Sequence, residues 1–298
     1  MREYPLQQKE KEARLIWASV RATQEAFRFK YKRSGKKSRS NWSLFERLLW
    51  FFKLLLRLTR WYKKGNANAK NIKVKRLKLS FEDLPPAFDG FRILQLSDLH
   101  IDAIEGLEDI LIREIKPLYF DLCVITGDFR KDTSGSFIQI LPAMKKLLSA
   151  MRPEQGVLAV LGNHDTYKMV EILEPLGVRF LVNESVQIEK GNQRIRISGT
   201  DDTFYFYTDM ALHALEIDAK EFSVALSHTS EMSDIAAENH FKFYLCGHTH
   251  GGQVRLFGYS PVVPSAFGNR FAYGHIIEKG RNLVVSGGLG FSIIPLRF

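Results

Sequence analysis

Cysteine is scarce in this chain: only Cys123 and Cys246 occur among 298 residues, and both lie inside apolar stretches. Thiols in such positions behave as small buried hydrophobic groups, which excludes a disulfide-stabilised framework and favours a reducing compartment. The chain also lacks any apolar run of about 18 residues or more, so we expect no membrane-spanning helix. Residues 1–40 are charged throughout and have no continuous apolar core, so we expect no secretory signal peptide.

Acidic residues are rare near the N-terminus. Residues 1–78 contain 23 Lys and Arg but only 5 Asp and Glu, whereas the rest of the chain carries 20 basic and 28 acidic side chains. The net charge of +10 therefore averages a basic segment and a mildly acidic remainder. We predict a basic, helical, membrane-associating segment at residues 1–70 and an enzyme-sized domain at 71–298. The alternating stretch Ile72–Leu79 predicts the first strand of that domain, with its lysines facing solvent.

A strongly amphipathic stretch lies within the basic segment. Residues 44–62 are mostly Leu, Phe and Trp, while Glu46, Lys53 and Arg57 fall on one narrow polar stripe of a helix that a Ser43 capping box would start. Such a helix is typical of peripheral attachment to anionic lipid, here at the inner, cytoplasmic face of a bacterial membrane. The alternative is docking on the domain itself or on a partner. Nucleic acid is not expected, because basic tails that bind it usually lack so apolar a face.

Five apolar stretches each end in residues that can bind a metal. They are Phe91–Leu96 before Ser97-Asp98-Leu99-His100, Leu122–Thr126 before Gly127-Asp128, Val157–Leu161 before Gly162-Asn163-His164-Asp165, Phe222–Ser227 before His228, and Phe243–Cys246 before Gly247-His248-Thr249-His250. Continuous apolar runs bounded by glycine or polar residues are typical of strands buried on both faces. Because open α/β sheets bind their ligands at the carboxyl ends of the strands, we expect these side chains to converge.

Seven of these side chains can donate to a metal: Asp98, His100, Asp128, Asn163, His228, His248 and His250. One ion takes roughly four to six donors, so this set suits two ions that share a bridging carboxylate. Two divalent ions about 3.5–4 Å apart stabilise the attacking and leaving oxygens at phosphorus and supply hydroxide near neutral pH. Oxygen and nitrogen donors suit hard or borderline divalent ions. We take Mn²⁺ as the first expectation, with Zn²⁺, Mg²⁺ or Fe²⁺ as alternatives.

These five motifs, in this order, resemble those of the calcineurin-like metallophosphoesterase superfamily. The motifs run from Asp98 to Gln253, and the flanking strands extend the resemblance from about Lys73 to the end. It implies an α/β fold, a four-layer α/β/β/α sandwich of two mixed sheets with the helices outside. It also implies that one metal is held by Asp98, His100 and His250, the other by Asn163, His228 and His248, with Asp128 bridging them.

The resemblance further implies a catalytic role for His164, which would stand over the substrate phosphate as transition-state stabiliser or general acid. Asp165 would then hydrogen-bond His164, fixing its tautomer and raising its pKa. Arg130 would either bind a substrate phosphate through a bidentate pair or lie solvated in a loop. Asp201-Asp202 would form either a third metal site or, as we expect, a loop turn.

Finer features resemble a membrane-associated bacterial branch of the superfamily. They are Gly251-Gly252-Gln253, Ser286–Gly290 and Pro295–Phe298, although chains of that branch usually continue beyond the last of these. The branch includes the UDP-2,3-diacylglucosamine pyrophosphatase of lipid A synthesis. The resemblance therefore implies hydrolysis of the pyrophosphate bond of a lipid-linked nucleotide sugar. The alternatives are a phosphodiesterase or phosphomonoesterase of broad specificity, acting on soluble or phospholipid substrates, and a non-catalytic scaffold, which the complete set of ligands disfavours.

Overall fold

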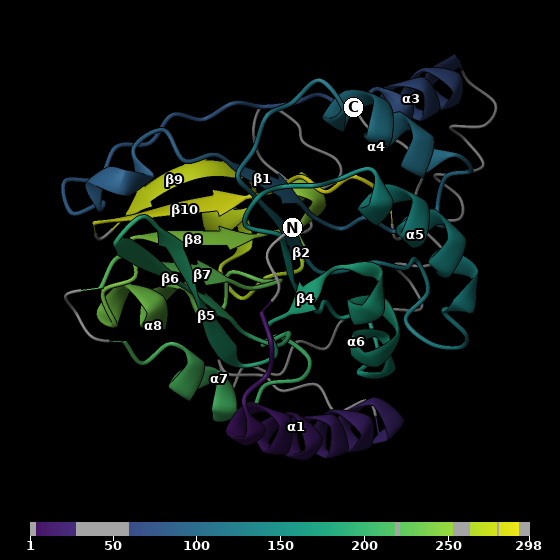
Figure 1. The fold of residues 1–298 in the computed structure, drawn as a ribbon. Coiled ribbons are helices and arrows are strands. Elements are labelled where there is room, and N and C mark those ends of the chain that lie inside the picture. The colour runs from purple at the N-terminus through teal and green to yellow at the C-terminus, as the bar shows by residue number, and fades with distance from the viewer. Residues whose placement is uncertain (1–3, 28–59, 218–220, 253–262, 279, 292–298) are drawn as a thin grey trace.

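Two β-sheets pack face to face in this protein, with helices on both outer sides (Figure 1). The computed structural model describes residues 4–27, 60–217, 221–252, 263–278 and 280–291. The expected amphipathic stretch at 44–62 lies outside these ranges up to residue 59, and its last three residues begin helix α3 (Arg60–Lys70). Within the described ranges, no helix has both the length and the apolar character needed to cross a membrane.

The first sheet is short, buried and wholly parallel. Its strands, in spatial order, are β1 (Ile93–Leu96), β2 (Leu122–Thr126), β3 (Val157–Val160) and β4 (Arg179–Phe180). The expectation of a mixed sheet is wrong here, because every pairing among these four strands is parallel. Leu96 pairs with Ile125, and Thr126 pairs with Val160. Because β1, β2 and β3 end level with one another, the polar residues that follow them emerge at one edge.

The second sheet is mixed and larger. Its strands, in spatial order, are β5 (Glu184–Lys190), β6 (Gln193–Gly199), β7 (Ser223–Leu226), β8 (Phe243–Cys246), β10 (Arg281–Val285) and β9 (Gly274–Glu278). The four central strands are parallel, and an antiparallel strand closes each edge. β7 and β8 therefore present the residues after Leu226 and Cys246 together, as the sequence predicts.

Three apolar layers hold this sandwich together. Val124 and Leu158 of the first sheet pack against Val224 and Leu226 of the second. Helices α4 (Leu107–Ile115), α5 (Leu141–Ser149) and α6 (Lys168–Leu173) cover the outside of the first sheet, while α7 (Met210–Ala214) and α8 (Ser233–Glu238) cover the second. Short 3-10 helices lie at Pro86–Phe88, Ile138–Ile140, Glu174–Leu176, His250–Gly252 and Gly268–Phe271. The predicted α/β/β/α sandwich is confirmed.

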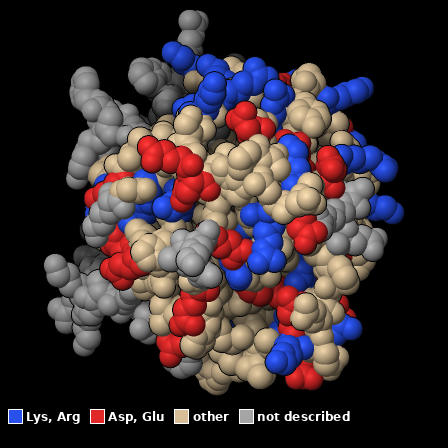
Figure 2. Space-filling view, turned by 60° about the vertical axis from the view of Figure 1, so that its left-hand side comes forward, with Lys and Arg blue, Asp and Glu red and all other residues tan. Residues whose placement is uncertain are grey.

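Segment 71–80 is not the strand that its alternating sequence predicts. It crosses the upper edge of the molecule in Figure 1 as irregular chain, with Lys73, Lys75 and Lys78 exposed. Lys75 lies over the Tyr273 ring, 4.4 Å from its centroid, which holds the segment through a side chain instead of a backbone ladder. Lys and Arg side chains gather along the upper edge in Figure 2, whereas charges of both signs mix over the rest of that face.

Helix α1 (Gln8–Phe27) lies against the lower end of the sandwich, near α6 and α7 (Figure 1). Its sequence is rich in Ala, Glu, Gln and Arg, which favour helices intrinsically. Arg14 forms ion pairs with Glu174 at 2.9 Å and with Glu184 at 2.7 Å. Trp17 and Arg21 are buried against loops of the sandwich. The division of the chain at residue 70 stays a prediction, and α1 is in contact with the domain across it.

Candidate metal centre

The backbone turns sharply at five of the seven residues that the sequence predicts as donors. Positive φ angles occur at Asp98 (49°), His100 (34°), Asp128 (58°), His248 (69°) and His250 (49°). Left-handed backbone costs roughly 1–2 kcal/mol per residue with a side chain, and Asp and His tolerate it better than most. Such residues cluster at functional sites. Here each turn directly follows a strand and directs a polar side chain into the space at the sheet edge.

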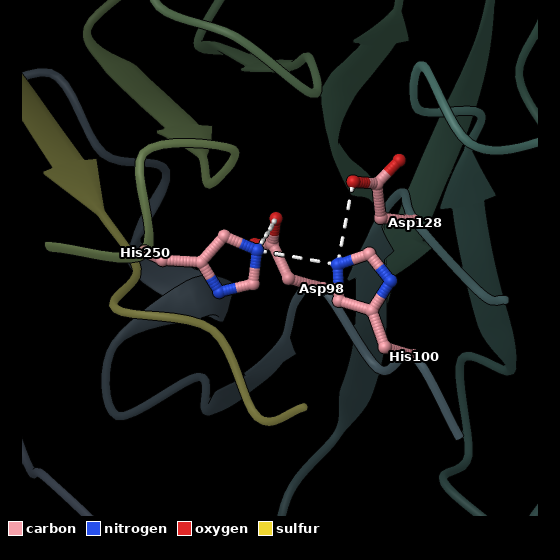
Figure 3. Close-up of side chains that lie close together, drawn as sticks. All are labelled: Asp98, His100, Asp128 and His250. Atoms are coloured by element: carbon pink, nitrogen blue, oxygen red, sulfur yellow. Dashed lines mark hydrogen bonds and ion pairs between the residues drawn. The ribbon is translucent and has the colours of Figure 1, made fainter. Parts of the chain in front are cut away.

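A first group of donors comes together from three strand ends (Figure 3). Asp98, His100, Asp128 and His250 each offer one atom, and these atoms lie within 4.8 Å of one another. His100 Nε2 lies 3.2 Å from His250 Nε2 and 3.5 Å from Asp128 Oδ2. His250 Nε2 lies 3.6 Å from Asp98 Oδ1. Two imidazole nitrogens facing each other between two carboxylates form a donor set that fits a divalent cation.

A second group shares one carboxylate with the first. Asp128, His228 and His248 offer donor atoms within the same 4.8 Å limit. His228 Nε2 lies 3.4 Å from Asp128 Oδ2, 3.1 Å from His248 Nδ1 and 3.2 Å from Asn163 Oδ1. Asp128 Oδ2 is thus close to an imidazole of each group. The structure brings all seven predicted donors into two adjoining clusters.

Main-chain carbonyls fix the orientation of two of these imidazoles. His100 Nδ1 donates to the Arg130 carbonyl at 2.7 Å, and His228 Nδ1 donates to the Thr126 carbonyl at 2.8 Å. A proton held on Nδ1 leaves the Nε2 lone pair available, which is how metal-binding histidines are commonly oriented. Both Nε2 atoms face Asp128. The local hydrogen bonds therefore suit metal ligation.

Burial sets the charge state of the cluster. It raises the pKa of Asp98 to about 6, with the Asp128 charge adding to the effect. It lowers the pKa of His100 to about 4 and that of His248 to about 3, so both imidazoles are neutral at pH 7, as ligands must be. Burial also acts to raise the pKa of Asp128, but the surrounding imidazoles, His228 first, hold it well below its usual value.

His228 behaves differently from the other buried imidazoles. Burial acts to lower its pKa, but the carboxylates of Asp128, Asp98 and Asp202 together, Asp128 first, raise the pKa well above the ordinary value. A proton on His228 and a cation between His228 and Asp128 therefore compete for the same negative charge. Metal uptake at this group would then release a proton.

The side chain of Asp165 hydrogen-bonds main-chain N–H groups and not the His164 ring, so that part of the sequence interpretation is wrong. Its Oδ1 accepts from the Phe129 N–H at 2.8 Å, and its Oδ2 accepts from the Asp128 and Gly162 N–H groups, both at 2.8 Å. Three backbone donors hold the carboxylate, and His164 Nδ1 contacts the Lys131 carbonyl instead. Asp165 therefore joins the loop after β2 to the loop after β3.

His164 lies at the solvent side of the cluster. Its side chain is 13% exposed, and its Nε2 lies 3.9 Å from Asp128 Oδ2. Its Nδ1 contacts the Lys131 carbonyl, and its main-chain N–H donates to Asp128 Oδ1 at 2.9 Å. The ring is T-shaped to that of His100, with centroids 4.8 Å apart. An anion entering from solvent would meet this imidazole.

Arg130 is a buried residue, which excludes the alternative of a solvated loop side chain. It is 3% exposed, and it donates from Nε to the His164 carbonyl at 2.6 Å and from Nη1 to the Gly135 carbonyl at 2.7 Å. Its contact with a substrate phosphate stays a prediction. Gly162 completes the packing behind this loop, because any side chain there would collide with the Asp128 carboxylate.

Asp201 and Asp202 have separate partners, which favours the expected turn over a third metal site. Asp202 accepts from the N–H groups of Phe204 at 3.2 Å and Tyr205 at 3.1 Å. Asp201 forms an ion pair with Arg21 and accepts from the Trp17 indole N–H at 2.7 Å. The contacts from α1 were missed by sequence reasoning. No local pattern pairs a helix near residue 20 with a carboxylate near residue 200.

Sequence comparisons match this chain to known proteins. A model of the calcineurin-like phosphoesterase family matches residues 91–252. The metallophosphoesterases YkuE and YkoQ of Bacillus subtilis are 30% identical over 229 residues and 31% identical over 202 residues. These alignments cover 72% and 64% of this chain, and 77% and 72% of the relatives. The phosphodiesterase YaeI of Escherichia coli is 29% identical over 224 residues, covering 70% of this chain and 77% of YaeI.

Proposed function

Because this chain belongs to the calcineurin-like phosphoesterase family and is a phosphohydrolase, we propose a specific substrate for it. We propose that it cleaves the pyrophosphate bond of a lipid-linked nucleotide sugar at a membrane surface. UDP-2,3-diacylglucosamine, a lipid A precursor, is the first candidate substrate. The pair of donor groups that share Asp128 carries the hydrolytic part of the proposal, and the cavity described below carries the lipid part. We assign two divalent ions to the donor groups, with Mn²⁺ as the first choice and Zn²⁺, Mg²⁺ or Fe²⁺ as alternatives.

The proposed ligand sets follow the two clusters. One ion is assigned to Asp98, His100 and His250, the other to Asn163, His228 and His248, and Asp128 is assigned to both. Two such ions would neutralise the phosphoryl oxygens and lower the pKa of a bound water. The chain itself keeps His100 and His248 unprotonated by burial and aims the donors through carbonyl contacts.

His164 is the residue we assign to the leaving group. Its Nδ1 contacts the Lys131 carbonyl and must carry a proton to donate to it. Only the positively charged imidazolium, which has a proton on each nitrogen, can also donate from Nε2. Nε2 is the nitrogen nearer Asp128 and the proposed substrate position. A proton given from it to the departing oxygen would serve as general acid catalysis.

A variant at this position separates chemistry from metal binding. Alanine in place of His164 removes the proton donor and no assigned ligand. We expect the metal content to stay at about two Mn²⁺ per chain, while the rate of phosphodiester cleavage falls by about 100-fold or more. Unchanged activity in His164→Ala, measured with bis-p-nitrophenyl phosphate, would remove the assigned role.

An apolar cavity supports a lipid-bearing substrate. A volume of about 1230 Å³ lies beneath segment 71–80, lined among others by Leu77, Phe91, Ile93 and Val284. Gly287–Leu289 also line it. At Gly288, whose φ is +72°, an added Cβ would lie 2.8 Å from His250 Nδ1. The cavity and the candidate metal centre therefore share one wall, which would suit a substrate with acyl chains beside its phosphates.

The membrane part of the proposal rests on the same edge of the molecule. The predicted amphipathic stretch leads directly into α3, and α3 leads into the basic segment 71–80 above the cavity. Exposed Lys73, Lys75 and Lys78 would attract anionic headgroups by roughly 1 kcal/mol each. We therefore propose that the protein lies on the inner, cytoplasmic face of the membrane, with the cavity facing the lipid.

The substrate test compares three phosphate compounds with Mn²⁺ and with chelator. UDP-2,3-diacylglucosamine, UDP-N-acetylglucosamine and bis-p-nitrophenyl phosphate differ in acyl chains and in bond type. We expect Mn²⁺-dependent release of UMP from the diacylated compound, and much slower cleavage of the unacylated one. Cleavage of only the generic ester would reject the lipid-linked substrate and leave the phosphohydrolase assignment in place.

A pair of variants tests the cavity directly. Val284→Phe would place a ring inside it, whereas Ile277→Phe enlarges a side chain on β9 that is 70% exposed and does not line it. We expect Val284→Phe to raise KM for the diacylated substrate at least about tenfold while leaving bis-p-nitrophenyl phosphate hydrolysis unchanged. Equal effects of the two variants would argue against acyl chains in the cavity.

A broad phosphodiesterase is the second candidate function. The observation in its favour is the similarity to YaeI, whose name denotes a phosphodiesterase. Such an enzyme would need the same metal centre and no acyl pocket. The substrate comparison above therefore decides between the two candidates.

A further inference from the structure

Helix α1 reaches the loop that carries two of the proposed functional residues. Arg21, which is 1% exposed, donates from Nη2 to the main-chain carbonyls of Gly162 at 3.1 Å and Asp165 at 3.0 Å. These carbonyls flank Asn163 and His164 on either side. One guanidinium group therefore spans both ends of the loop.

A second side chain of α1 holds the residues that follow. Glu25 accepts from the Thr166 hydroxyl at 2.6 Å and from the Tyr167 N–H at 2.9 Å. It also accepts from Arg21 Nε at 3.0 Å. Arg21 and Glu25 lie one helical turn apart on the same face of α1. Loop residues 162–167 are thus attached to the helix at four points.

The other side of Arg21 is attached to a second loop of the centre. Its Nη1 pairs with the buried Asp201 carboxylate, and its guanidinium lies over the Phe206 ring, 3.4 Å from the centroid. Between these two residues, Phe204 packs against His248 with ring centroids 5.6 Å apart. α1 therefore connects the loop of Asn163 with the loop that packs on His248, and both residues are assigned to the same ion.

We propose that Arg21 is a positioning residue of the metal centre, which fixes the loop of Asn163 and His164 from outside the family domain. The proposal rests on the function proposed above and deepens it. Removing the guanidinium frees two carbonyls and lets the loop move. A displacement of about 1 Å at a catalytic group can cost on the order of 100-fold in rate. Because Arg21 contacts main-chain carbonyls of the loop and does not line the cavity, we expect kcat to fall far more than KM.

Two variants of α1 separate positioning from simple anchoring of the helix. Arg21→Met removes the contacts with the loop. Arg14→Met removes ion pairs between the same helix and Glu174 and Glu184, which lie outside loop 162–167. Both variants are made in the full chain. They are compared by kcat and KM for bis-p-nitrophenyl phosphate, by Mn²⁺ titration and by thermal unfolding.

We expect Arg21→Met to lower kcat on the order of 100-fold with KM changed less than about threefold. One of the two Mn²⁺ ions should bind at least about tenfold more weakly, because Asn163 and His248 serve the same ion. Arg14→Met should unfold at a lower temperature yet keep kcat within about twofold of the parent. Equal losses of kcat in both variants, or none in either, would overturn the proposal.

A folding defect in Arg21→Met would not end the test. Its removal leaves Asp201 buried without a counter-charge, so the double variant Arg21→Met with Asp201→Asn restores neutrality. Glu25→Gln offers a milder change, since its side chain is 20% exposed and keeps one acceptor. The double variant should repeat the selective loss of kcat and the weaker binding of one Mn²⁺, and Glu25→Gln should show the same changes to a smaller degree. Failure of the proposed function would appear differently, as a parent protein without phosphoesterase activity or without two bound Mn²⁺.

Discussion

Asp165→Asn is the substitution that most directly tests how the metal-bearing loops are joined. The carboxylate accepts three backbone N–H groups, from Asp128, Phe129 and Gly162. An asparagine oxygen can keep the two bonds at the Oδ2 position, but its NH₂ group then faces the Phe129 N–H. That loss leaves a buried donor unpaired, which costs about 1–3 kcal/mol. The two retained bonds lose their charge, at a cost of roughly 1 kcal/mol each.

One effect opposes these losses. Burial, and then the Asp128 charge, raises the pKa of Asp165, so removing its charge relieves part of that repulsion. This relief offsets part of the loss, so we expect a net destabilisation of about 2–4 kcal/mol. Urea unfolding of the full chain, in chelator, measures this difference. Asp89→Asn, an exposed position, is the matched control and should change stability by less than about 0.5 kcal/mol.

The same variant discriminates between the two roles considered for Asp165. If the carboxylate only joins loops, the pH profile of kcat should keep its shape in Asp165→Asn while stability falls. If it orients His164, as the sequence interpretation held, the profile should shift while stability stays near that of the parent. The second result would refute the assignment made from the hydrogen bonds.

Three further predictions concern protons, packing and thiols. Burial raises the pKa of Asp98 to about 6, so its carboxylate gains a proton as the pH falls from about 7.5 to about 5.5. The affinity for Mn²⁺ should therefore drop up to about tenfold per pH unit below that pKa. The same Kd at both pH values in a calorimetric titration would contradict this. Gly162→Ala should weaken Mn²⁺ binding and lower the Tm by several degrees, because its methyl group meets the Asp128 carboxylate; an unchanged Mn²⁺ Kd would contradict the packing. Burial raises the pKa of the Cys123 and Cys246 thiols, so neither should react with a thiol reagent at about pH 8 until urea unfolds the chain, and rapid labelling of the native protein would count against their burial.

The strands and the donor positions could be predicted because both depend on residues that are close together in the sequence. Five apolar runs, such as Leu122–Thr126 and Phe243–Cys246, became strands in the structure. Each is followed at once by its polar residues, so placing the strand also places the donor. The parallel register then brings ends that are distant in sequence to one edge.

The errors lie where a side chain has a choice of partners. Asp165 adjoins His164 in sequence, which suggested a contact, yet three backbone N–H groups compete for it more effectively. Segment 71–80 alternates as a strand does, but alternation does not supply a neighbouring edge. Arg21 and Asp201 are 180 positions apart, and the pattern of an amphipathic helix says nothing about which loop will receive its buried face.

The left-handed turns at the donors restrict how this centre could ever be rebuilt. A residue at Asp98, Asp128 or His248 must satisfy two conditions at once: it must offer a donor atom, and it must tolerate a positive φ. Asp, Asn and His meet both conditions, whereas β-branched and bulky residues are strongly disfavoured at a positive φ. An engineer who wanted thiolate ligands here would first have to redesign the turns. The backbone conformation at five residues thus limits which amino-acid types can occupy the donor positions, whichever metal is bound.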